Sequence, residues 1–160
     1  MLFRSRAATL QNPLFGKTNI ISTQSEYSLL NRKVEEEVIP ASIEMNIGFL
    51  AWSPLGRGVL TGKYRNGVPS DSRGASAHFA SFVSPYLDGK SKKIVDAVCV
   101  ASEGLGFSPL EVALSWVRDS YGVSSAIVGA RTAAQLRGAL TVEEITLPDQ
   151  VRAALDEISI

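Results

Sequence analysis

The chain has 160 residues, of which 45% are hydrophobic and 20% are charged, so it can bury a core and does not have the composition of a disordered segment. Lysine plus arginine and aspartate plus glutamate number 16 each, so the overall charge gives no indication of binding to nucleic acid or to an anionic membrane. The single cysteine, Cys99, excludes an internal disulfide, and no apolar run reaches the length of a membrane span. We therefore expect a cytoplasmic protein.

The first 17 residues differ from the rest of the chain. They contain Arg4, Arg6 and Lys17 and no acidic residue. Basic, acid-poor starts occur in organellar targeting peptides, but this stretch is short and only weakly amphipathic. We interpret Ser5–Gln11 as the remnant of a helix from a longer fold and assign the domain itself to residues 18–160.

Three short apolar segments predict buried strands, at Asn19–Thr23, Ile47–Trp52 and Ser124–Val128. The middle segment is apolar without alternation, which is typical of a parallel strand covered on both faces. Gln24 stands at the expected end of the first strand and Trp52 at the end of the second.

Helical patterns lie between and after the strands. The capping signature from Ser108 to Glu111 opens one helix, and a similar pattern from Thr132 to Gln135 opens another. Three further helices are predicted at Val38–Met45, Ser91–Leu105 and Pro148–Ile158. Alternating strands and helices favour an α/β fold with a parallel sheet.

The segment from Pro54 to about Ser84 is rich in glycine and serine and has no periodicity, so it is predicted to be a long loop. It follows the carboxyl end of a strand, where α/β proteins bind their ligands. Trp52 stands at its start, and glycines and cations follow as far as Tyr64. An aromatic ring beside glycines and cations suits a flat aromatic ligand that also carries phosphates.

Four separated motifs then resemble those of the aldo-keto reductases, which are NADPH-dependent carbonyl reductases built on a TIM barrel. The motifs are Gln24–Arg32, Trp52–Gly58, Gly62–Tyr64 and Ile127–Leu136. The resemblance is strongest to bacterial and plant members and to potassium-channel β subunits. It implies a partial (β/α)₈ barrel, made of the last three strands with their helices, as the C-terminal half of such a protein.

The resemblance also implies roles in binding NADP(H). Gln24 would hydrogen-bond the nicotinamide carboxamide, and Trp52 would stack on the nicotinamide ring. The turn after Trp52 would approach the pyrophosphate through Ser53, Pro54, Leu55 and Gly56, with Arg57 as an additional phosphate contact. Read from the residues alone, a strand-end glutamine could instead cap a loop, and a tryptophan could instead belong to the core.

Further cations and a helix start would complete the implied cofactor site. Lys63 and Arg73 match cofactor-binding positions of the channel β-subunit branch, although loop cations are commonly only solvated. Gly129, Arg131 and Gln135 surround the end of the last strand, and Arg131 would contact the 2′-phosphate that distinguishes NADPH from NADH.

One departure concerns the adenine end of this site. Where the family often has Glu-Asn, this chain has Gly138 and Ala139, so adenine would be held more weakly or by packing.

The family's catalytic Asp, Tyr, Lys and His would lie on earlier strands, and His78 matches none of them. We therefore predict no catalytic residue and no metal site in these residues. Three functions remain open: the cofactor-binding half of an oxidoreductase that acts on a small carbonyl substrate once completed, a non-catalytic module that binds NADP(H) or a partner protein, and a truncated inactive product. Open barrel edges would also favour self-association or complementation.

Overall fold

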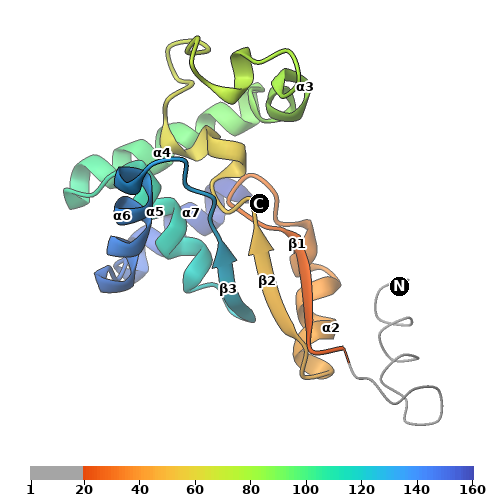
Figure 1. The fold of residues 1–160 in the computed structure, drawn as a ribbon. Coiled ribbons are helices and arrows are strands. Elements are labelled where there is room, and N and C mark those ends of the chain that lie inside the picture. Colours follow the sequence, from red (N-terminus) through yellow and green to blue (C-terminus); the bar gives the residue numbers. More distant parts are fainter. Residues whose placement is uncertain (1–19) are drawn as a thin grey trace.

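A computed structural model describes residues 20–160 of the chain, so the predictions for residues 1–17 lie outside the described part. Three parallel strands form one sheet in the order β1-β2-β3. They are β1 (Ser22–Glu26), β2 (Gly48–Trp52) and β3 (Val123–Ile127). Helices connect and cover them, as in part of a (β/α)₈ barrel (Figure 1), which confirms the predicted α/β class.

The main helices occupy the regions that the sequence predicts. They are α2 (Val38–Glu44), α4 (Gly89–Leu105), α5 (Pro109–Arg118), α6 (Ala133–Leu140) and α7 (Asp149–Ser159). Single turns of 3₁₀ helix lie between them, at η1 (Lys33–Glu35) and η5 (Thr141–Glu144). In α7 Leu155 is buried, whereas Ile158 is 39% exposed.

Helix caps place the helix boundaries. Ser108 caps α5 and forms a complete capping box with Glu111, as predicted. The start of α4 was predicted at Ser91, but the helix begins at Gly89 because the side chain of Asp88 accepts a hydrogen bond from the Ser91 amide at 2.7 Å. The buried apolar residues of α4, from Ile94 to Cys99, follow a first turn that is polar.

The first strand lies further along the chain than predicted. The expected Asn19–Thr23 strand is instead Ser22–Glu26, paired residue by residue with Gly48–Trp52 of β2. Its sequence is polar, so apolar character alone misplaced it. Gln24 consequently lies in the middle of β1 rather than at its end. The third strand is shifted by one residue from the predicted Ser124–Val128.

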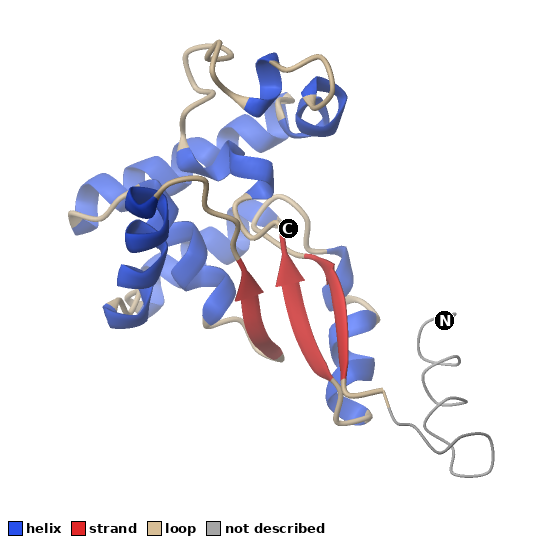
Figure 2. Ribbon diagram, viewed as in Figure 1, coloured by secondary structure: helices blue, strands red, loops and turns tan. Residues whose placement is uncertain are grey.

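The two faces of the sheet have different environments. On β2, Phe49 and Ala51 are fully buried, whereas Leu50 and Trp52 on the opposite face are half-buried. In Figure 2 the helices α4, α5 and α7 lie to the left of the strands and further from the viewer, and buried residues of all three join Phe49 and Ala51 in one core cluster. The prediction that β2 is covered on both faces is therefore wrong for the described residues, because they supply helices to one face only.

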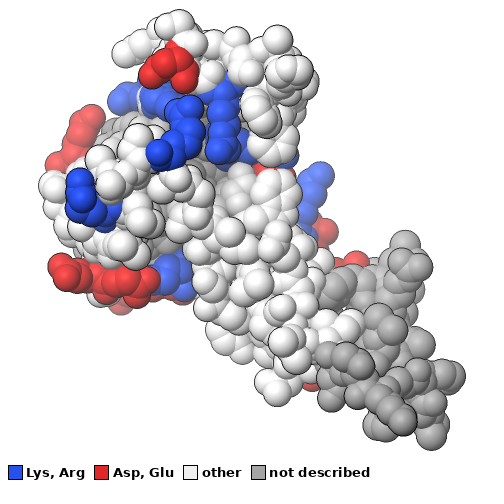
Figure 3. All heavy atoms as spheres, in the orientation of Figure 1, with Lys and Arg blue, Asp and Glu red and all other residues white. Residues whose placement is uncertain are grey.

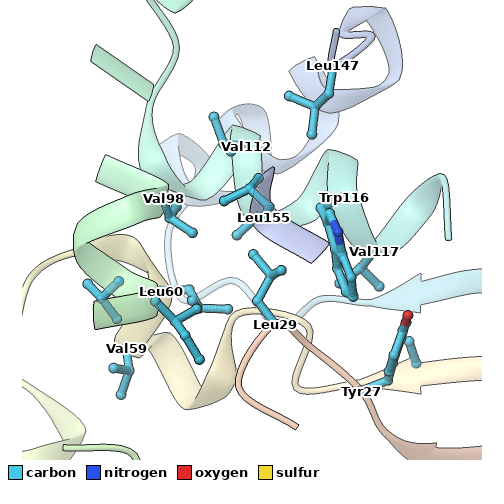
Figure 4. Close-up of a cluster of buried hydrophobic side chains, with 14 of the residues drawn as sticks. Tyr27, Leu29, Val59, Leu60, Val98, Val112, Trp116, Val117, Leu147 and Leu155 are labelled. Carbon is cyan, nitrogen blue, oxygen red and sulfur yellow. The ribbon is translucent and has the colours of Figure 1, made fainter. Parts of the chain in front are cut away.

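The core lies between that covered face and the helices (Figure 4). Trp116 of α5 is 1% exposed, and its ring lies 5.4 Å from that of Tyr27, which follows β1. Leu29, Leu60 and Leu155 fill the space around them. Cys99 of α4 is also buried and belongs to this cluster.

The predicted long loop contains short helices. They are η2 (Gly56–Thr61), η3 (Arg73–Ala75), α3 (Ala80–Val83) and η4 (Ser84–Tyr86). Residues 73–86, here called the α3 lobe, project from one end of the molecule in Figure 1. Helices of a single turn are too short to show a helical period, which explains the incorrect prediction of an irregular loop.

Within residues 20–160, no single helix is long and apolar enough to cross a membrane; α4 and α5 meet the length and composition test only when taken together, across a 102° bend.

Candidate functional site

A cleft of about 330 Å³ opens where β2 and β3 end. One wall is the turn that follows Trp52, and another is the segment from Ile127 to Arg131. Arg73 and Phe82 of the α3 lobe line it as well. The cleft therefore lies at the carboxyl ends of parallel strands, the position where α/β folds bind ligands.

The turn after β2 has an unusual backbone. Ser53, Gly56, Arg57 and Gly58 all have positive φ, at 56°, 53°, 60° and 90°. Positive φ is strained for serine and arginine, so neighbouring contacts must hold it. One such contact is the hydroxyl of Ser53, which accepts a hydrogen bond from the Arg57 amide at 2.9 Å.

Gly56 faces away from the cleft, and Pro54 is largely buried. A Cβ on Gly56 would lie 2.6 Å from Cδ1 of Leu30, so Gly56 packs against the body of the protein and does not line the cleft. Pro54 lines the cleft but is otherwise buried. Ser53 and Leu55 also line it, as the sequence predicts.

Arg57 is engaged within the protein. Its guanidinium donates two hydrogen bonds to the carboxylate of Glu26, at 3.0 and 2.8 Å, and a third to the carbonyl of Phe82. The Glu26 hydrogen bond is the main cause that raises the pKa of Arg57. Arg57 lines the cleft, but its charge is already paired with Glu26 inside the protein, and the phosphate contact at Arg57 stays a prediction.

Three other cations line the cleft, namely Lys63, Arg73 and Arg131. All three side chains are exposed, and no ion pair joins them to a carboxylate in the described part of the chain. Figure 3 shows lysine and arginine atoms gathered in the hollow below the α3 lobe. None of the described residues that line the cleft is acidic, so the cleft favours an anionic ligand.

The start of α6 closes the far side. The hydroxyl of Thr132 accepts a hydrogen bond from the Gln135 amide at 3.2 Å, and Oε1 of Gln135 accepts one from the Arg131 amide at 2.8 Å. The predicted cap is therefore present, and Gln135 orders the segment that carries Arg131. Nothing lies within 4 Å of a Cβ placed on Gly129, so the backbone there is open to a ligand.

The cleft brings together ten of the twelve residues singled out in the sequence. Gln24 and Gly56 are the two that do not line it. Sequence reasoning missed Thr61, Phe82 and Leu110, whereas Ala139, which also lines the cleft, was placed at the adenine end of the implied site. Phe82 could not be found from the sequence, because its helix is a single turn and shows no periodic pattern. Leu110 was correctly predicted to lie in a helix, but nothing in the sequence indicates that this helix reaches the cleft.

Comparisons with known proteins agree with this architecture. A sequence model described as "Aldo/keto reductase family" matches residues 6–160. The chain is 36% identical over 141 residues to "Probable voltage-gated potassium channel subunit beta" of Arabidopsis thaliana, covering 86% of this chain and 42% of that protein. It is 34% identical over 140 residues to "Protein tas" of Escherichia coli, covering 87% and 40%.

A third relative is "Uncharacterized oxidoreductase YrpG" of Bacillus subtilis, 32% identical over 139 residues, or 87% of this chain and 40% of that protein. The chain thus spans about two fifths of the length of these relatives.

Proposed function

Because this chain belongs to the aldo/keto reductase family, we propose that its cleft binds NADP(H) within an oxidoreductase that reduces aldehydes or ketones to alcohols. The observation that carries this proposal is the cleft itself. It joins the half-buried Trp52 ring to cationic side chains at the ends of β2 and β3, with no acidic residue among the described lining. An apolar ring beside several cations matches a ligand that has both an aromatic ring and phosphates.

The residues present fit a dinucleotide. Trp52 would hold the nicotinamide ring, and the start of the turn, Ser53 to Leu55, would face the pyrophosphate. Lys63 and Arg73 would neutralise phosphate charge, while Arg131 would hold the 2′-phosphate through its planar guanidinium. When bound, the dinucleotide supplies or accepts hydride. A reducing, cytoplasmic location fits the buried free thiol of Cys99.

We assign no catalytic residue among these 160 positions. Tyr64 is buried, and its hydroxyl accepts a hydrogen bond from the Gly74 amide at 3.2 Å, which gives it a structural role. The proton donor of the proposed reaction would belong to a part of the protein outside these residues. We therefore expect the 160-residue chain to bind NADPH and to show no aldehyde reduction by itself.

The decisive measurement is a titration of the chain with NADPH and NADH. NADPH is expected to bind more tightly, and Arg131→Gln is expected to reduce this preference about tenfold by removing one charge-assisted phosphate contact. Arg137→Gln is the matched control, because Arg137 is an exposed arginine of α6, the helix that follows Arg131, and does not line the cleft. Absence of saturable binding to either nucleotide would contradict the proposal.

A second candidate is a binding module without catalysis. It is favoured by the similarity to proteins named as channel β subunits in Arabidopsis thaliana, in Oryza sativa (41% identical) and in Schizosaccharomyces pombe (33% identical). In that case the cleft would bind NADP(H) as a sensor and another surface would contact a partner protein. Adding the rest of the protein to the chain separates the two candidates, since the first predicts that aldehyde turnover then appears.

A further inference from the structure

We propose that Arg57 is a positioning residue that fastens the α3 lobe as a wall of the cleft, rather than a residue that binds the ligand. The first observation is its pair with Glu26, at the end of β1. The two side chains are only 15% and 12% exposed, and the guanidinium meets both carboxylate oxygens. This fork fixes the plane of the guanidinium and cancels its charge.

The second observation is the set of contacts on the lobe side. The Arg57 guanidinium donates to the carbonyl of Phe82, and its central carbon lies 3.9 Å from the centre of the Phe82 ring and 4.7 Å from that of Tyr86. Phe82 is itself a lining residue of the cleft. One side chain therefore joins the end of β1 to α3, which lines the cleft through Phe82, and to the adjoining η4.

The third observation is the strained backbone that presents this side chain. Arg57 has a φ of 60°, between Gly56 and Gly58, which also have positive φ. A non-glycine residue keeps such a conformation only where surrounding contacts determine it. Those contacts come from the Glu26 carboxylate, the Phe82 carbonyl and the Ser53 hydroxyl. The bonds of Arg57 to Glu26 and Phe82, here called the latch, and the turn therefore stabilise each other.

That the α3 lobe encloses a nucleotide rests on the proposed function. That Arg57 holds the lobe in position does not. The lobe has other attachments, since Val83 is fully buried and the Gly74 amide bonds to Tyr64. Losing the latch should therefore loosen α3 and η4 without releasing the whole segment. The cations that remain to bind phosphate are Lys63, Arg73 and Arg131.

Hydrogen exchange of the full chain without nucleotide tests the latch directly. Glu26→Gln and Arg57→Met are each expected to speed exchange of the amides in residues 80–87 about tenfold, and the double variant no more than either single one. Asp119→Asn is the matched control, because Arg118 and Asp119 form a similar fork at 2.6 and 2.8 Å that does not involve the lobe. Unchanged exchange in both latch variants would overturn the proposal.

Two further variants guard against loss of the fold. Phe82→Ala keeps the ion pair and removes a ring, so it should speed exchange in the lobe and leave the β2 amides protected. Arg57→Lys keeps the charge, but an ammonium cannot bond both oxygens of Glu26 in one plane or stack on the Phe82 ring. It should therefore behave like Arg57→Met. If Glu26→Gln fails to fold, exchange in Phe82→Ala decides the matter, and no change there refutes the latch.

Nucleotide kinetics distinguish the latch from direct binding. If Arg57 is a latch, both Glu26→Gln and Arg57→Met release NADPH faster, to the same extent. If Arg57 binds phosphate, Glu26→Gln frees its charge and tightens binding while Arg57→Met weakens it, and this pattern would overturn the proposal. If no variant binds NADPH, the proposed function fails, and the exchange experiment alone still decides the latch.

Discussion

Trp52 occupies the position where β2 leaves the sheet. Its ring is half-buried and lines the cleft beside the turn. Such a ring contributes contact area and a fixed orientation to a flat ligand, worth about 1 kcal/mol beyond simple burial. It is therefore the side chain whose removal should affect nucleotide binding without disturbing the buried core.

We predict that Trp52→Ala weakens NADPH binding about tenfold, while Trp52→Phe retains most of it. Nucleotide fluorescence measures the affinity independently of the protein's own tryptophans. Tyr121→Ala is a suitable control, because Tyr121 is 84% exposed and does not line the cleft. Equal NADPH affinities for Trp52→Ala and the unchanged chain would show that Trp52 does not contact the nucleotide.

Tyr27 couples the core to pH. Its side chain is 2% exposed, and its hydroxyl donates a hydrogen bond to Glu35 at 2.6 Å. Burial, followed by that hydrogen bond, raises the pKa of Tyr27 well above its ordinary 10.0. The folded chain therefore holds the proton more tightly than the unfolded chain, so this stabilisation is complete below pH 10 and falls as the pH rises above it.

Accordingly, Tyr27→Phe should lose stability less steeply than the unchanged chain between pH 10 and 11. The difference in slope should approach about 1.4 kcal/mol per pH unit, the value for one proton. Urea unfolding at several alkaline pH values measures it. Parallel curves for the two chains would show that Tyr27 ionises normally.

The η2 turn depends on a close approach of its backbone to the core. Gly56 has a φ of 53°, and a Cβ there would lie 2.6 Å from Leu30. We expect Gly56→Ala to lower the free energy of unfolding by about 2 kcal/mol, through both backbone strain and overpacking. Gly104→Ala offers a control, since a Cβ there meets nothing within 4 Å and the residue lies inside α4. A Gly56→Ala chain as stable as the unchanged one would show that the turn relaxes freely.

Helix α5 begins with a capping box that is also sensitive to acid. The amide and hydroxyl of Ser108 hydrogen-bond the Glu111 carboxylate and hold its pKa below the ordinary 4.5. This contribution is therefore present above pH 4.5 and is lost as the pH falls through the lowered pKa. Ser108→Ala should cost about 1 kcal/mol at pH 7 and less at pH 3, measured by thermal unfolding. An equal cost at both pH values would contradict this assignment.

At the scale of the whole molecule, the sheet has two outer strands. In the part of the chain that the structure describes, β1 and β3 each pair with β2 alone. On the less covered face, Ile127 is 40% exposed, and Val128, which follows it, is 42% exposed. Unpaired strand edges beside exposed apolar side chains favour association.

We therefore expect the isolated 160-residue chain to associate with itself. Light scattering over a range of concentrations should show a mass above 17.1 kDa that increases with concentration. A lysine placed on the outer edge of β3, at Ser125, should reduce the association. A concentration-independent monomer with a sharp two-state melt would contradict the expectation.

The sequence by itself determined the fold class, the five main helices and most of the cleft. Caps such as Ser108 and Thr132 act within one turn, and apolar stripes follow the helical period, so both can be read without knowing the partners. The motif after Trp52 likewise marked its turn as a site, because glycines and cations there are a local feature of the chain.

Tertiary structure alone decided the rest. Gln24 and Gly56 do not line the cleft, because their positions depend on strand pairing and on the contact with Leu30, and both involve segments distant in sequence. The charge of Arg57 is paired with Glu26, which lies 31 positions earlier in the chain, so the pair could not be predicted from the local sequence. Long-range pairing fixes which face a side chain occupies and whether its charge is already neutralised, and neither property is encoded in the local pattern.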